Sequence, residues 1–185
     1  MDEGTTLMQR ALDAARLGPE ADPNPRVGCV ITAPAGEVVG VGHHRGAGTP
    51  HAEVEALAAA GDEARGGTAY VTLEPCSHTG RTGPCTEALL EAGVTSVVYA
   101  VADPDPVASG GAAWLAEHGV AVSAGVLAAA AEELNATWLH LRRAGRPWVT
   151  WKGAATLDGH TAAVDGTSRW ITGAAARADV HALRA

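Results

Sequence analysis

Four residues of the sequence have side chains that could build a catalytic metal site. His51 and Glu53 are separated by one alanine, and Cys76 and Cys85 follow with eight residues between them. A catalytic zinc ion takes three protein ligands and leaves its fourth position to water. We predict that His51, Cys76 and Cys85 are these ligands and that Glu53 carries protons rather than binding the metal.

Hydrolytic deamination would use all four side chains. Two thiolates and a neutral imidazole offset the charge of Zn²⁺, and the metal lowers the pKa of its bound water toward about 7. The resulting hydroxide attacks a ring carbon that bears an exocyclic amine, while Glu53 passes the proton of the water to the ring nitrogen and then to the leaving amine. An H-x-E motif followed by Pro-Cys and a second Cys is the signature of zinc deaminases.

The spacing of the two cysteines departs from that signature, in which two residues separate them. Here Ser77–Pro84 lie between them, which predicts an inserted loop. Each motif alone also has a structural explanation, because an H-x-E tripeptide occurs by chance and buried cysteines are commonly inert. We interpret Cys29 as a core residue of a strand, since a fourth protein ligand would make the zinc site structural.

The long loop makes a family resemblance specific. His-Ala-Glu at His51 and Thr-Leu-Glu-Pro-Cys-Ser-His-x-Gly-Arg-Thr-x-Pro-Cys from Thr72 resemble the deaminase domain of the bacterial bifunctional riboflavin-biosynthesis deaminase–reductases, the RibD/RibG type. Three further segments resemble its N-P-x-V-G motif, its D-P-N-P motif and the start of its reductase domain: Asn24–Gly28, Asp103–Pro106 and Lys152–Gly173. The resemblance therefore covers nearly the whole chain.

The resemblance implies a reaction and a substrate. It implies hydrolytic deamination of 2,5-diamino-6-(5-phosphoribosylamino)pyrimidin-4(3H)-one to the 5-amino-uracil product, with release of ammonia, in riboflavin biosynthesis. Full-length relatives also reduce the ribosyl group with NADPH. Most of that reductase domain lies outside these 185 residues, so we expect reduction and NADPH binding only in the context of a complete domain.

The resemblance also assigns residues to the substrate and the cofactor. The substrate contacts implied for the deaminase domain are Asn24, His44, Ser77, His78 and Arg81. Arg81 is expected to meet the phosphate, because a guanidinium binds such groups through two parallel hydrogen bonds. In the reductase fragment, Ser168 and Arg184 resemble substrate contacts, and Lys152, Ala154 and Trp170 resemble cofactor contacts.

Other interpretations of single residues remain open. Without the family, Asn24 would be a turn residue and His44 a solvated loop histidine. Asp105 replaces the usual Asn of the D-P-N-P motif, and an ionised carboxylate cannot donate a hydrogen bond. The role of Asp105 therefore stays open, and Glu74 is interpreted as orienting the ligand loop rather than reacting.

Composition limits the classes of function. The net charge of −8 argues against a large nucleic-acid surface. Three cysteines do not form a disulfide framework, and neither a signal peptide nor a long apolar run is present. We predict a soluble cytoplasmic protein with a small phosphorylated pyrimidine substrate and neither nucleic-acid nor membrane partners. The incomplete second domain would expose apolar surface and favour a homo-oligomer.

Hydrophobic patterning predicts an α/β fold. Helices are expected over 6–17, 51–60, 84–91, 110–118, 127–143 and 177–185, and strands over 27–33, 37–41, 68–73, 95–102, 120–123 and 147–152. The first two strands form a hairpin, and helical crossovers then give parallel strands. We predict a three-layer α/β/α, cytidine-deaminase-like mixed sheet over residues 1–145, and a fragment of a dihydrofolate-reductase-like domain over 146–185.

Three rival functions remain open. A deaminase of another nucleoside, nucleobase or tRNA would need a basic stripe beside the metal, and the acidic composition and the long loop count against it. A non-catalytic domain in which zinc only staples the fold would bind metal without turnover. An independent reductase or nicotinamide-binding module would need more chain than the short C-terminal segment provides.

Overall fold

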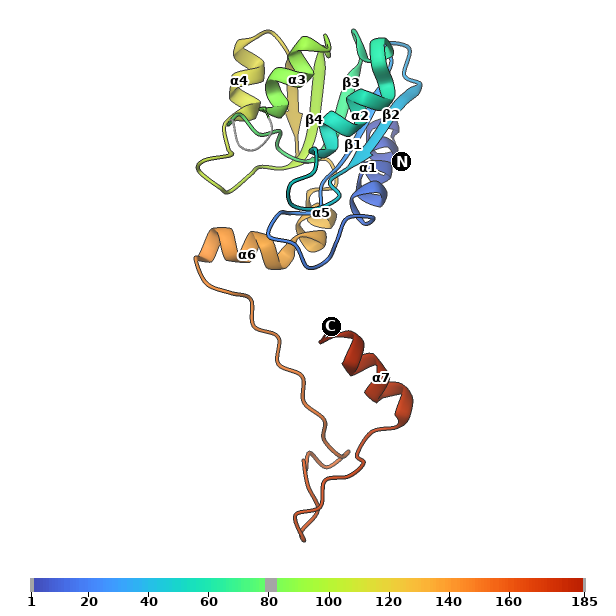
Figure 1. Ribbon diagram of the computed structural model, residues 1–185, viewed down its shortest axis with the longest axis vertical. Helices are drawn as coiled ribbons and strands as arrows, with labels where there is room; N and C mark the ends of the chain where they lie inside the picture. Colours follow the sequence, from blue (N-terminus) through green and yellow to red (C-terminus); the bar gives the residue numbers. More distant parts are fainter. Residues whose placement is uncertain (1, 79–82, 185) are drawn as a thin grey trace. The chain divides into compact units, whose positions relative to one another are not determined.

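The computed structural model describes residues 2–78 and 83–184. It divides into two compact units, Met1–Trp148 and Val149–Ala185 (Figure 1). Each unit is described by itself below.

The N-terminal unit is built on a mixed five-stranded sheet in the order β2-β1-β3-β4-β5. Its strands are β1 (Gly28–Thr32), β2 (Val38–His43), β3 (Thr68–Leu73), β4 (Ser96–Val101) and β5 (Ala121–Ala124). β1 pairs antiparallel with both β2 and β3, whereas β3–β4 and β4–β5 are parallel. The predicted arrangement, an antiparallel hairpin followed by parallel strands, is confirmed.

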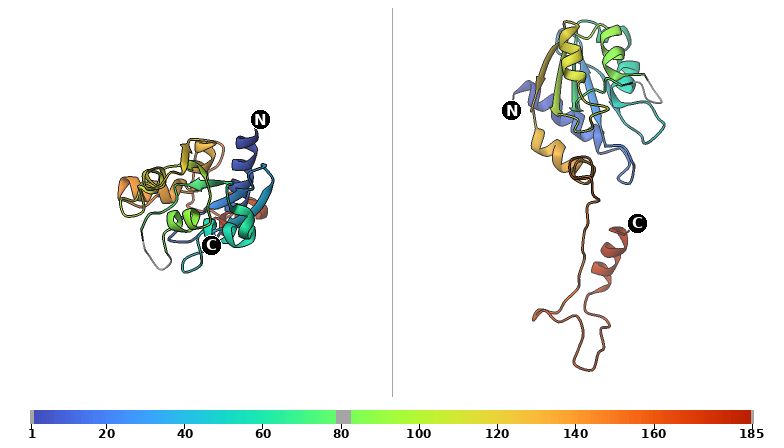
Figure 2. Two further views of the ribbon diagram at one scale, coloured as in Figure 1. Left: turned by 90° about the horizontal axis from the view of Figure 1, so that it is seen from above. Right: turned by 90° about the vertical axis from the view of Figure 1, so that its left-hand side faces the viewer.

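Helices cover both faces of this sheet (Figure 2). They are α1 (Glu3–Ala15), α2 (Ala52–Ala60), the short 3-10 helix η1 (Gly61–Ala64), α3 (Cys85–Glu91), α4 (Gly111–Glu117), α5 (Ala128–Leu134) and α6 (Ala136–Ala144). One buried cluster joins α2, α3 and α4 to the sheet, and a second joins α1, α5 and α6 to it. Within the described part of the chain, no helix combines the length and the apolar character that crossing a bilayer requires.

Alternation along β1 explains why both faces are apolar. Cys29 and Ile31 belong to the cluster with α2, while Val30 between them belongs to the cluster with α1. Successive side chains of a strand point to opposite faces, so a continuous apolar run marks a strand that is covered on both sides. The sequence contains no Phe, and Val, Leu, Ile, Met and Ala fill these two clusters instead.

The helix predicted over 127–143 is in fact two helices, α5 and α6, which meet at Asn135. The Asn135 side chain is buried and pairs with the backbone of Arg26. Its Oδ1 accepts from the Arg26 N–H at 2.9 Å, and its Nδ2 donates to the Arg26 carbonyl at 2.8 Å. This tertiary pairing fixes the break between the helices and ties them to the chain just before β1.

We predict that Asn135→Ala destabilises the N-terminal unit by about 1–3 kcal/mol, because it leaves the N–H and carbonyl of Arg26 without these partners. Urea denaturation would measure the change. Glu133→Ala, an exposed position of α5, is the control and should change stability by no more than about 0.5 kcal/mol. Equal stabilities of the two variants would contradict this account of the break.

The C-terminal unit differs from its prediction. Residues 147–152 are all described and form no strand, so the expected strand is wrong. A strand requires a neighbouring strand to form a ladder, and residues 147–152 belong to no strand of the described sheet, with Trp151 86% exposed. The helix α7 (Ala174–Ala182) begins three residues before the predicted start at 177. None of the apolar side chains described in residues 149–184 is buried, so this segment builds no core of its own.

Candidate active site

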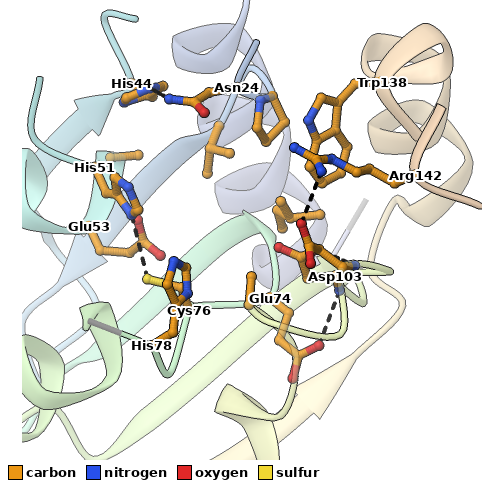
Figure 3. A pocket seen from close by; sticks show the side chains of 16 residues that line it. Asn24, His44, His51, Glu53, Glu74, Cys76, His78, Asp103, Trp138 and Arg142 are labelled. Atoms are coloured by element: carbon orange, nitrogen blue, oxygen red, sulfur yellow. Dashed lines mark hydrogen bonds and ion pairs between the residues drawn. The ribbon is translucent and has the colours of Figure 1, made fainter. Parts of the chain in front are cut away.

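Three separate elements deliver the predicted metal ligands to one place. His51 directly precedes α2, Cys85 is the first residue of α3, and Cys76 follows the end of β3 by three residues. Sites in open α/β sheets lie at the carboxyl ends of strands and the starts of helices, as these three do. Figure 3 shows His51, Glu53 and Cys76 facing the same space.

The donor atoms of His51, Cys76 and Cys85 all lie within 4.8 Å of one another. His51 Nδ1 is 3.2 Å from Cys85 Sγ and 3.6 Å from Cys76 Sγ. A tetrahedral zinc with bonds of about 2.1 Å to nitrogen and about 2.3 Å to sulfur places these atoms about 3.6 Å apart. The chemistry and the spacing of this donor set therefore fit a zinc ion.

Cys29 does not complete a set of four ligands. Among the described residues, the one group able to hold a metal contains His51, Cys76 and Cys85 and leaves Cys29 out. Cys29 is fully buried and packs in the apolar cluster beneath α2. A group of three protein donors is the composition of a catalytic zinc site rather than a structural one.

The three side chains alter one another's protonation. The pKa of Cys76 falls to about 4, first because Cys85 hydrogen-bonds to its sulfur and then because His51 does. The pKa of Cys85 rises, chiefly through its interaction with Cys76, and the pKa of His51 rises for the same reason. The neighbours of Cys76 thus favour its ionised form, those of Cys85 favour its neutral form, and a bound metal ion would favour the ionised form of both sulfurs.

Glu53 lies in the first turn of α2 and is only 3% exposed. Burial raises the pKa of its carboxyl to about 7, and the negative charge of Cys76 adds to this shift. A carboxyl with this pKa can both accept and donate a proton near neutral pH. Its place beside the metal ligands suits a proton carrier.

A cavity of about 210 Å³ opens beside this cluster. The polar residues that line it are Asn24, His44, His51, Glu53, Glu74, His78, Asp103, Asp105 and Arg142. Cys76 and Trp138 line it too, and Figure 3 shows Trp138 and Arg142 across the cavity from His51. The cavity is therefore lined by residues from early and late in the sequence of the N-terminal unit, from Asn24 to Arg142.

Asn24 and His44, predicted from the resemblance as substrate contacts, lie together in this cavity. The Nδ1–H of His44 donates to the Pro50 carbonyl at 3.1 Å, which leaves its Nε2 to accept from Asn24 Nδ2 at 3.1 Å. His44 is 5% exposed, so the solvated-loop interpretation of this histidine is wrong. Contact of either residue with a substrate stays a prediction.

Of the substrate contacts predicted between Cys76 and Cys85, one lines the cavity, one does not, and one lies outside the described residues. His78 lines the cavity, and its Nδ1 is buried without a hydrogen-bond partner. The Ser77 hydroxyl instead donates to the Ser109 carbonyl at 3.1 Å, and Ser77 is not among the lining residues. Arg81, the predicted phosphate contact, lies outside the described residues.

The five predicted residues of the C-terminal unit do not form one group. Ser168 and Trp170 line an open depression within that unit, together with Asp158 and His160. Lys152, Ala154 and Arg184 are not among its lining residues. Their predicted roles toward NADPH and the substrate remain predictions.

Trp138 and Arg142 were not among the sequence-predicted site residues. They lie four residues apart on α6, and the Arg142 guanidinium sits 5.5 Å from the centre of the Trp138 ring. Arg142 Nη1 is 3.2 Å from Asp105 Oδ2, so Asp105 forms an ion pair at the cavity wall. No motif of the sequence marked these two positions, and their place on α6 beside the cavity comes from the packing of that helix.

Comparison with known proteins agrees with this geometry. Residues 1–101 match the family model for the cytidine and deoxycytidylate deaminase zinc-binding region. The chain belongs to this zinc-binding deaminase family. Residues 147–185 match the RibD C-terminal domain, so the chain contains the beginning of that domain as well.

Individual relatives place this chain among the RibD-type proteins. The riboflavin biosynthesis protein RibD of Escherichia coli is 52% identical over 180 residues, which cover 96% of this chain and 49% of that protein. The RibD structure of Acinetobacter baumannii in form 2 superposes with a TM-score of 0.91 at 46% identity, covering 98% of this chain and 51% of its own.

A third relative is named for both of its activities. The Thermotoga maritima diaminohydroxyphosphoribosylaminopyrimidine deaminase/5-amino-6-(5-phosphoribosylamino)uracil reductase superposes with a TM-score of 0.88 at 39% identity, covering 98% of this chain and 53% of its own. The chain spans about half the length of the curated relatives it matches. The cytidine-deaminase-like fold and the RibD-type resemblance are thereby confirmed.

Proposed function

We propose that the chain deaminates 2,5-diamino-6-(5-phosphoribosylamino)pyrimidin-4(3H)-one and releases ammonia in riboflavin biosynthesis. The observation that carries the proposal is the meeting of His51, Cys76 and Cys85 around one point, with buried Glu53 beside them at the end of a cavity. The high identity to RibD proteins supports the choice of substrate.

His51, Cys76 and Cys85 would hold the zinc ion, with Cys29 left in the core. A zinc ion there would supply Lewis acidity that makes water nucleophilic near neutral pH. The described residues offer three protein donors, which is the number of ligands that a catalytic zinc ion would take from the protein.

Glu53 would manage the protons of the reaction. Its carboxylate takes a proton from the attacking water, and the protonated acid then gives it to the ring nitrogen. A second transfer through Glu53 reaches the exocyclic amine, which leaves as ammonia while a carbonyl forms at the ring carbon. The pKa of about 7 lets Glu53 work in both directions. Asn24 and His44, already paired, would orient the ring from the opposite side.

The remaining assignments are part of the same proposal. Residues 146–185 would open a reductase domain, and NADPH would bind only when that domain is complete. The partner would be a small phosphorylated pyrimidine rather than a nucleic acid, with Arg81 meeting the phosphate. We also propose a cytoplasmic protein and a homo-oligomer formed through the apolar side chains that residues 149–184 leave exposed.

The decisive assay offers the zinc-loaded protein the diaminopyrimidine phosphate and, in parallel, cytidine. We expect stoichiometric ammonia release and an absorbance change with the first and no turnover with the second. Turnover of cytidine but not of the diaminopyrimidine would end the substrate assignment while leaving a zinc deaminase.

A further inference from the structure

Glu74 lies between the metal-ligand segment and the cavity wall without being a predicted ligand. It follows β3 directly, is 8% exposed, and its carboxylate accepts three backbone hydrogen bonds. The N–H of Asp103 donates to Oε2 at 3.1 Å. The N–H groups of Gly110 and Ala112 donate to Oε1 at 3.2 and 3.0 Å. The Glu74 carboxylate thus accepts hydrogen bonds from both ends of the segment between β4 and α4.

Within the segment between β4 and α4, two aspartate side chains accept hydrogen bonds from the backbone two residues further on. Asp103 Oδ1 accepts from the Asp105 N–H at 2.8 Å, and Asp105 Oδ1 accepts from the Val107 N–H at 3.0 Å. The other oxygen of Asp105 pairs with Arg142 of α6 at 3.2 Å. Asp103, Asp105 and Arg142 all line the cavity, so the position of this wall depends on where Glu74 holds Asp103.

The start of α4 packs closely against the peptide that precedes Cys76. A Cβ at Gly111, the first residue of α4, would lie 1.8 Å from the Pro75 carbonyl oxygen. Pro75 stands between Glu74 and Cys76 in the sequence. The start of α4 is therefore in contact with the peptide that precedes the metal ligand, and the N–H groups of Gly110 and Ala112 on either side of Gly111 donate to Glu74.

We propose that Glu74 is a positioning residue for substrate binding, which sets the wall formed by Asp103 and Asp105 relative to the metal-ligand segment. The proposal deepens, and rests on, the proposed deaminase function. Glu74 borders the cavity, but its two carboxylate oxygens accept from backbone N–H groups, so the role assigned to it is positioning rather than substrate contact. It acts through the backbone of Asp103.

We call the three backbone hydrogen bonds to Glu74 the clamp: one comes from Asp103, and two come from Gly110 and Ala112. The variant Glu74→Gln distinguishes the first of these bonds from the other two. A glutamine has one accepting oxygen, which can keep Gly110 and Ala112, and its NH₂ group then faces the N–H of Asp103 as donor against donor. We expect an unchanged zinc content, a KM raised about tenfold and a kcat within about twofold of the original. Amide hydrogen exchange followed by NMR should speed up at Asp103 and not at Gly110 or Ala112.

Glu87→Gln makes the same chemical change on the exposed side of α3 and should leave the KM, the kcat and the three amides unaltered. Loss of zinc together with a fall in kcat and faster exchange at all three amides would mark Glu74 as merely structural and overturn the proposal. An unchanged KM despite faster exchange at Asp103 would overturn it too. If the original protein shows no turnover, the proposed function fails separately, and protection of Asp103 retained in Glu74→Gln would still overturn the clamp.

Discussion

Replacing Glu53 by glutamine is expected to lower kcat by about a thousandfold or more while zinc stays bound. Positioned proton transfer contributes about 10²–10⁴ to rates, and an amide can neither accept nor return the proton. The side chain remains nearly isosteric and is fully enclosed in the first turn of α2, so the fold should tolerate it. Ammonia release and metal analysis on the same sample measure the two quantities together.

This experiment also separates an enzyme from a zinc-stapled domain. Glu63→Gln, an exposed position of η1, is the matched control and should retain both zinc and turnover. A Glu53→Gln protein that keeps most of its activity would show that protons move by another route. A wild-type protein that binds zinc stably and turns nothing over would favour the structural role.

Removing one sulfur ligand is expected to abolish stoichiometric zinc binding and turnover together. In Cys85→Ala the donor set loses one of its three members, and two donors hold zinc poorly. Zinc that binds only the folded state at about a thousand times its Kd stabilises by about 4 kcal/mol. The melting temperature of Cys85→Ala should therefore no longer respond to added zinc or to a chelator.

Cys29→Ala supplies the control, since it removes a fully buried thiol of the same size from the core. It should keep one zinc per chain and its activity, with only the modest destabilisation of a lost core contact. Equal zinc loss in both variants would place Cys29 in the metal site and contradict the three-ligand arrangement. Thermal melts with and without a chelator, combined with metal analysis, distinguish these outcomes.

Some of the fold was predictable because the relevant physics is local. The apolar run that contains Cys29, Val30 and Ile31 indicated a strand buried on both faces, and the structure has β1 there. The helix predicted over 127–143 was too long. Hydrophobic periodicity carries no information about a side chain that hydrogen-bonds to the backbone of a residue far away in the sequence. Asn135 pairs with Arg26, 109 residues away in the sequence, and this contact sets the break.

The sequence by itself determined the chemical inventory: an imidazole, two thiols and a carboxylate at spacings typical of a zinc deaminase, and a loop between the cysteines that indicated the RibD type. Residue identity decides which atoms can donate, bind or carry a proton, so these inferences needed no coordinates. The tertiary structure alone decided that Trp138 and Arg142 of α6 close the cavity and that Glu74 grips the backbone of Asp103. Such contacts join segments that are far apart in the chain, and only the packing of helices against a sheet brings their atoms within hydrogen-bonding distance.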